Sequence, residues 1–128
     1  MGEIAVFEKD KKPNKWIQYD VDTEVLIFYQ DREDLNAIRI KAEKNARLTG
    51  ANSSKLMDIY LGRKAVGGWR KIEDHKHPGL TIGGKPIEFN ERNLDMFMTK
   101  SNEFARFVNE KCVDSLEFLE EGVLPNGQ

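Results

Sequence analysis

With 128 residues, 33% of them charged and 39% hydrophobic, the chain has the size and composition of one globular domain. Its net charge of -2 argues against charge-driven binding to nucleic acid or to a membrane surface. We expect a single domain over residues 1–128, with a flexible tail over 122–128, where proline and glycine occur. The first residues lack the basic region and apolar run of a signal peptide, and a lone cysteine permits no internal disulfide, so we expect a cytoplasmic protein.

Two segments near the start of the chain are typical of β-strands. Residues 16–19 and 25–29 are rich in β-branched and aromatic side chains, and the residues between them can form a turn. We expect an antiparallel hairpin or a three-stranded meander. It must pack against another element, because an isolated hairpin is only marginally stable in water.

About four helices are expected after these strands. Asp31 is a candidate N-cap of the first helix, which ends at Gly50. A second helix begins at Asn52 or Ser53 and ends at the glycine pair 67–68. Its apolar residues point in several directions, so we expect it to be central.

A small hairpin is expected before the third helix. The glycine pair 83–84 tolerates the positive φ that a tight turn requires. Asn90 is a candidate N-cap, and Phe89 and Leu94 have the spacing of a hydrophobic staple around it. The expected fold class is α+β and mainly helical.

The last helix is expected to run from Ser101 to about Glu120. Its apolar residues fall within one half of the helical circumference, which is wider than the stripe of an ordinary surface helix. The helix is therefore either buried on two sides or in contact with another chain, and we favour the first reading. The apolar half contains Phe104, Phe107, Val108, Cys112, Leu116, Phe118 and Leu119.

Residues with metal-binding or nucleophilic chemistry are few. The cluster Glu73, Asp74, His75 and His77 contains suitable metal ligands, but no further ligands recur nearby at metal spacing, so we expect a solvated loop. Cys112 lies among apolar neighbours without an evident activating base, and we expect a small buried hydrophobe. We therefore expect no enzymatic activity, no cofactor and no metal.

A run of basic residues between positions 39 and 71 is the one candidate for a charged surface. Acidic Glu43 and Asp58 interrupt it, and it lacks a series of aromatic residues on which bases could stack, so we expect no nucleic-acid binding. An acidic protein surface is the favoured alternative. The run consists of Arg39, Lys41, Lys44, Arg47, Lys55, Arg63, Lys64, Arg70 and Lys71.

Trp69 can be read in two ways. It is either a core residue whose indole N–H donates to a carbonyl or an exposed interface anchor. We favour the core, because the tight glycine pairs nearby bring backbone segments close together.

The order of these motifs resembles the tail assembly chaperones encoded by long-tailed bacteriophages and prophages. In that family a V-x-x-W turn, a G-K-P-x-x-F hairpin and a helix led by asparagine recur in this order. Here the matching stretches are 66–69, 84–89 and 90–94, between a β-hairpin and an amphipathic helix rich in acid at its end. The matching structural residues are Trp69, Gly84, Pro86, Phe89, Asn90 and Leu94.

The resemblance implies a non-enzymatic protein of the host cytoplasm that is absent from the mature virion. It would bind the tape measure protein and promote assembly of tail tube protein around it, with a homo-oligomer possible. The alternative is a small structural protein of the phage tail or head–tail connector. Wide apolar helix faces suit helix-in-groove binding, and methionines suit adaptable contacts. The expected partner-binding residues are Met96, Met98, Phe104, Phe107 and Phe118.

Overall fold

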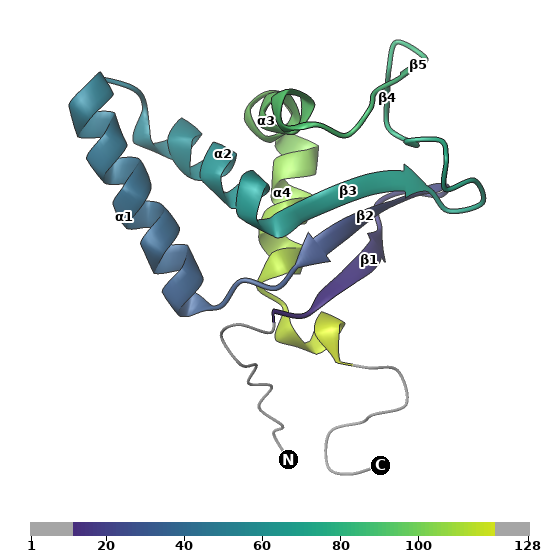
Figure 1. The fold of residues 1–128 in the computed structure, drawn as a ribbon, viewed down its shortest axis with the longest axis horizontal. Coiled ribbons are helices and arrows are strands. Elements are labelled where there is room, and N and C mark those ends of the chain that lie inside the picture. The colour runs from purple at the N-terminus through teal and green to yellow at the C-terminus, as the bar shows by residue number, and fades with distance from the viewer. Residues whose placement is uncertain (1–11, 120–128) are drawn as a thin grey trace.

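The computed structural model describes residues 12–119 (Figure 1), so the expected flexible tail 122–128 lies outside the described residues. This part of the chain forms a three-stranded sheet, a two-stranded hairpin and four α-helices. The fold class is therefore α+β and mainly helical, as expected. In chain order the elements are β1 (Asn14–Gln18), β2 (Thr23–Phe28), α1 (Arg32–Thr49), α2 (Ser53–Ala65), β3 (Val66–Lys71), β4 (Thr81–Ile82), β5 (Lys85–Pro86), α3 (Glu91–Lys100), α4 (Asn102–Cys112) and the 3₁₀ helix η1 (Ser115–Phe118).

The larger sheet is antiparallel, in the order β1-β2-β3. Strands β1 and β2 form the expected hairpin, but β3 arrives from beyond α2 and was not expected. The glycine pair 67–68, interpreted as the end of a helix, lies inside β3 next to a register shift in its pairing with β2. A Cβ at Gly67 would come within 2.5 Å of the Phe28 ring. Glycine is therefore needed here because a neighbouring side chain lies over the strand, and not because a helix ends.

The two faces of this sheet have different coverings. One face packs against the helices and carries Ile17, Val25, Ile27 and Trp69, which are all buried. In Figure 1, α4 lies behind the sheet on this side, and no described helix covers the opposite face. There the Arg70 guanidinium lies 3.7 Å from the centre of the Trp16 ring.

Local capping interactions set the beginnings of the helices. In α1 the Asp31 carboxylate accepts from the Asp34 backbone N–H, and the Asp34 carboxylate accepts from the Asp31 N–H, which makes a capping box. The side chains of Asn52 and Asn90 cap α2 and α3, each accepting from a backbone N–H three residues later. Gly50 ends α1 with a φ of 77°. These caps confirm the expected helix starts.

Helix α2 is central, as expected, and packs against α1 on one side and α3 on another (Figure 1). Gly62 is buried within it, and a Cβ at this position would lie 2.5 Å from Met98 Cγ. The glycine therefore allows α2 and α3 to approach closely. The Arg63 guanidinium also joins the two helices, with Nε and Nη2 donating to the two Asp95 carboxylate oxygens at 3.1 and 2.7 Å.

The last helix is shorter than expected. Helix α4 ends at Cys112, and the chain turns before η1, whose N-cap Asp114 accepts from the Leu116 N–H. The turn brings the Phe118 ring to 5.6 Å from that of Tyr29, so Phe118 is buried although it is not in the long helix. Apolar spacing alone did not reveal this break, since it continues through the turn.

Candidate functional site

A hollow in the described part of the chain lies beside the junction of α3 and α4. It consists of two adjoining cavities of about 560 and 380 Å³ that both include Tyr19 and Asp20. We call it the Tyr19 groove. Three segments far apart in sequence line it, namely the turn between β1 and β2, residues 79–82, and the consecutive helices α3 and α4. Its lining residues are Tyr19, Asp20, Gly79, Leu80, Thr81, Ile82, Met96, Phe97, Lys100, Ser101, Glu103, Phe104, Arg106, Phe107 and Glu110.

The turn between β1 and β2 holds one wall of the Tyr19 groove in place. The Asp20 carboxylate accepts from the backbone N–H groups of Asp22 and Thr23 at 3.1 and 2.9 Å. The Tyr19 N–H donates to the Thr23 carbonyl at 2.8 Å. An Asx turn of this kind is a local consequence of aspartate in a tight connection. It fixes the backbone from which the Tyr19 ring projects.

Ser101 determines how the two helices of the groove meet. It is the C-terminal cap of α3 and the N-cap of α4, and its Oγ accepts from the Phe104 N–H at 3.1 Å. Because a single residue separates the helices, the last turn of α3 and the first turns of α4 form one continuous wall. Half-buried Met96 and Phe107 come from either side of this junction.

A cluster of aromatic rings forms the floor of the groove. The Tyr19 ring lies 5.7 Å from Phe104 and 5.0 Å from Phe107, the second contact being edge-to-face. Beneath them Trp69 contacts Phe97 at 5.0 Å and Phe104 at 5.9 Å. Such ring pairs add stabilisation of about 0.5–1.5 kcal/mol each beyond area burial. The floor therefore consists of rings that already pack against one another.

Charged side chains of both signs surround the apolar floor. Asp20, Glu103 and Glu110 are acidic, whereas Lys100 and Arg106 are basic, and all five are exposed. The pKa of Tyr19 is raised above its ordinary value by burial, and further by the negative charges of Glu103 and Asp20. The Tyr19 phenol thus stays protonated at neutral pH and can donate a hydrogen bond.

The five residues expected to bind a partner divide between this groove and the core. Met96 and Phe107 are half-buried and line the groove. Phe104 also borders it, but only 2% of its surface is exposed, as for Met98. Met98 packs against Gly62, and Phe118 packs against Tyr29. Met98, Phe104 and Phe118, which were also expected to bind a partner, are therefore buried, because neighbouring elements cover them.

Trp69 is a core residue, as expected, and 4% exposed. Its indole N–H donates to the Ile87 carbonyl at 2.8 Å, which ties the segment after β5 to the sheet. The Phe89 ring meets the Trp69 ring edge-to-face at 4.9 Å. This tryptophan therefore links the chain on either side of the small hairpin to the helices.

The other structural residues also form the expected local structure. Gly84 has a φ of 81°, which is the left-handed conformation expected of a tight hairpin, and Pro86 lies in β5. Asn90 caps α3, and Leu94 is buried four residues later. These residues shape the segment that leads into the α3 wall of the groove.

The candidate metal and nucleophile residues lie outside the groove. Glu73, Asp74 and His75 are exposed, and the His77 Nδ1 accepts from the Gly79 N–H at 2.9 Å. Among residues 12–119, no three histidines, cysteines or acidic residues are grouped closely enough to hold a metal ion. Cys112 is fully buried, and burial raises the pKa of its thiol to about 12, so it is a small core residue as expected.

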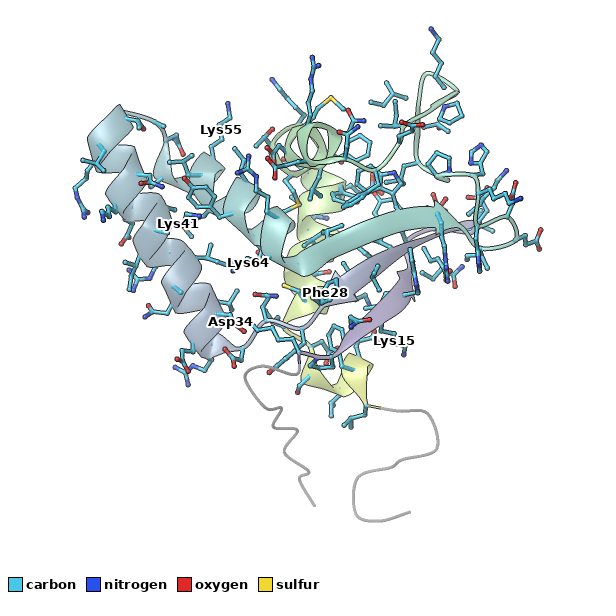
Figure 2. The ribbon with its side chains drawn as sticks, in the orientation of Figure 1. Lys15, Phe28, Asp34, Lys41, Lys55 and Lys64 are labelled. Carbon is cyan, nitrogen blue, oxygen red and sulfur yellow. The ribbon has the colours of Figure 1, made fainter. Side chains whose placement is uncertain are left out.

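The basic run does not form one continuous patch. Arg39, Arg63 and Arg70 pair with Glu43, Asp95 and Glu24, respectively. Figure 2 shows Lys41 on α1 and Lys55 and Lys64 towards opposite ends of α2. Lys41 also lies 4.5 Å from the centre of the Tyr60 ring.

Sequence reasoning did not identify Tyr19, Asp20, Ile82 or Lys100 as groove residues. An aromatic residue next to an Asp-x-Asp turn is a weak local signal, and the groove exists only where this turn meets α3 and α4.

No helix in residues 12–119 is long and apolar enough to cross a membrane. The chain was compared with protein-family models, with curated proteins and with solved structures, and none of the three comparisons gave a match.

Proposed function

We propose that this protein is a tail assembly chaperone of a bacteriophage or prophage. In this role it binds the tape measure protein in the host cytoplasm, promotes assembly of the tail tube protein and leaves before the virion is complete. No catalysis, cofactor or metal is required. The order of motifs between residues 66 and 94 supports the proposal by its resemblance to that family.

The observation that carries the proposal is the Tyr19 groove. A tape measure protein is long and helical, so its chaperone needs a surface that accepts an apolar helix face. The groove offers half-buried Met96 and Phe107 beside Tyr19, on a floor of packed rings. Helix-in-groove recognition uses an apolar floor of this kind, and methionine adapts to different side chains.

The charged rim suits reversible binding. Acidic and basic residues alternate along α4, where Glu103, Arg106 and Glu110 line the groove. Exposed charges at the rim of an interface chiefly affect association rate and orientation, and add little affinity. A chaperone that must release its partner needs moderate affinity, which fits an apolar groove with an exposed charged rim.

Co-expression with a fragment of the tape measure protein tests the proposal directly. The gene would be taken from the same genome, where this reading of the chain predicts a very long reading frame downstream. We expect the fragment to become soluble and to elute with this protein from a sizing column. An insoluble fragment and no complex would contradict the chaperone role.

Mass spectrometry of purified virions distinguishes the chaperone from the structural alternative. A tail or head–tail connector component remains in the particle in stoichiometric amount, whereas the chaperone is absent. Detection of this chain in washed, intact virions at a level comparable with tail proteins would favour the alternative.

A further inference from the structure

Strand β1 forms a free edge of the larger sheet. It lies at one end of the strand order β1-β2-β3, and Figure 1 shows no described strand beyond it. A strand in this position presents a row of unpaired backbone N–H and C=O groups, to which a strand of another polypeptide can bind. The Tyr19 groove does not extend to this edge, since neither of its cavities is lined by a residue of β1.

Every second residue of β1 turns its backbone groups towards the free edge. The Pro13 carbonyl accepts from the Tyr29 N–H at 2.9 Å, just before the strand begins. In an antiparallel pair such bonds recur at every second residue, so the odd-numbered residues of β1 bond to β2. The even-numbered residues therefore point their N–H and C=O groups outward, and none of these groups has a backbone partner among residues 12–119. They are Asn14, Trp16 and Gln18.

The residue types that commonly protect a sheet edge, proline and lysine, do not block this one. Pro13 and the backbone of Lys15 face β2, and the Lys15 Nζ lies 4.0 Å from the Glu117 carboxylate on the face that the helices cover. The outward-pointing residues are all uncharged, and Asn14 and Gln18 are exposed. The edge is therefore open to a further strand.

We propose that β1 pairs in antiparallel fashion with β1 of a second copy of this chain, about a twofold axis at Trp16. Asn14 of each copy then faces Gln18 of the other, and the two Trp16 residues face each other. All the outward groups are used, in about six backbone hydrogen bonds. An axis at Asn14 or at Gln18 would leave one end of each strand unpaired. The two sheets become one continuous sheet that carries the helices of both copies on the same face.

The strand and the turn after it are complementary to themselves, which favours a second copy over a foreign strand. Antiparallel pairing directs Lys15, whose side chain is 50% exposed, towards the turn of the other copy, where Asp20 and Asp22 are exposed. A foreign peptide that adds to a sheet edge is selected by pockets for its alternate side chains, and the Tyr19 groove supplies none along β1. This inference does not rest on the proposed function.

Disulfide trapping between two single-cysteine variants tests the register. Asn14→Cys and Gln18→Cys proteins are mixed in a glutathione buffer, and intact-mass spectrometry without reductant separates the three possible dimers. Facing residues have Cα atoms about 5.5 Å apart, which suits a disulfide, whereas the two copies of position 14 lie roughly 13 Å apart. The mixed dimer should exceed each symmetric dimer about tenfold or more. Asn14→Cys mixed with Val21→Cys, at a position that is 90% exposed in the turn, should show no such excess.

Sedimentation equilibrium of proline and alanine variants tests the backbone hydrogen bonds. Gln18→Pro removes an outward N–H, and by symmetry two hydrogen bonds of the dimer, whereas Gln18→Ala removes only the side chain. The dimer Kd should rise about tenfold or more in Gln18→Pro and stay unchanged in Gln18→Ala. Circular dichroism checks that both variants are folded, and the disulfide experiment needs neither of them.

A wild-type protein that stays monomeric at millimolar concentration would overturn the proposal without any variant. Symmetric disulfide dimers as abundant as the mixed one, or equal weakening by proline and alanine at Gln18, would overturn it as well. Self-association without the mixed disulfide would place the interface elsewhere and contradict the proposal too. The double variant Met96→Ser with Phe107→Ser should dimerise like the wild type, so the failure of this inference and the failure of the chaperone proposal are distinguishable.

Discussion

Phe104 and Phe107 are one turn apart on the same helix, yet they belong to different regions of the molecule. Phe104 is 2% exposed and contacts Trp69 and Phe97 in the core. Phe107 is half-buried and contacts the Tyr19 ring at the edge of the groove. The difference in burial arises from β3, because this strand places Trp69 against Phe104 and does not cover Phe107. Helical spacing therefore identifies apolar residues, but the arrival of distant segments decides which become core and which become binding surface.

Reactivity of the lone cysteine gives the largest expected effect on the core side of this comparison. Cys112 is fully buried, so alkylation with iodoacetamide at pH 8.5 requires unfolding and should be about a thousandfold slower in native protein than in urea. Its thiol pKa is about 12 when folded and lower when unfolded. The neutral thiol therefore contributes stability that is present below about pH 9 and is lost as pH rises towards 12. A native rate close to that in urea would show that the core opens locally around α4.

Replacing each of the two phenylalanines by alanine should give the next largest difference, in the free energy of unfolding. Phe104→Ala removes a fully packed ring and should lower the free energy of unfolding by about 3–5 kcal/mol. Phe107→Ala removes a half-exposed ring and should cost about 1 kcal/mol. Urea titrations with unchanged slope measure both values. Equal losses would contradict the division into core and groove.

The close approach of α2 and α3 predicts a smaller effect at Gly62. Alanine is the better helix former by about 1 kcal/mol, but its Cβ would crowd Met98 Cγ, so Gly62→Ala should destabilise the protein by about 1–2 kcal/mol overall. The same substitution in a Met98→Ala background should be neutral or stabilising. A double-mutant cycle without coupling between the two positions would show that the helices do not meet at this glycine.

Local features of the fold could be predicted from sequence, because their interactions span only a few residues. The caps at Asp31, Asn52 and Asn90 and the tight turn at 83–84 are examples. Strand β3 could not be predicted in this way. A pair of glycines such as Gly67 and Gly68 looks the same in the sequence whether it ends a helix or lies in a strand beneath large side chains of a neighbouring strand. The break after Cys112 was also missed, as apolar spacing continues across it.

The candidate site was only partly predictable for the same reason. Trp69 was interpreted as a core residue whose N–H meets a carbonyl, and the Ile87 carbonyl accepts it. Met96 and Phe107 are two of the five residues that the family resemblance led us to expect in partner binding, and both line the groove. Tyr19 and Asp20 could not be identified as groove residues from the sequence, because their place beside α4 depends on the packing of the whole sheet.

The affinity of a tape measure fragment for groove variants tests the central claim most directly. The double variant Met96→Ser with Phe107→Ser removes two half-buried apolar groups from the Tyr19 groove, whereas Leu48→Ser removes a leucine that is 72% exposed on α1. Isothermal titration with a soluble fragment should show binding weakened about tenfold or more by the double variant and unchanged by Leu48→Ser, with both proteins folded. Wild-type affinity in the double variant would contradict the assignment of this groove as the chaperone surface.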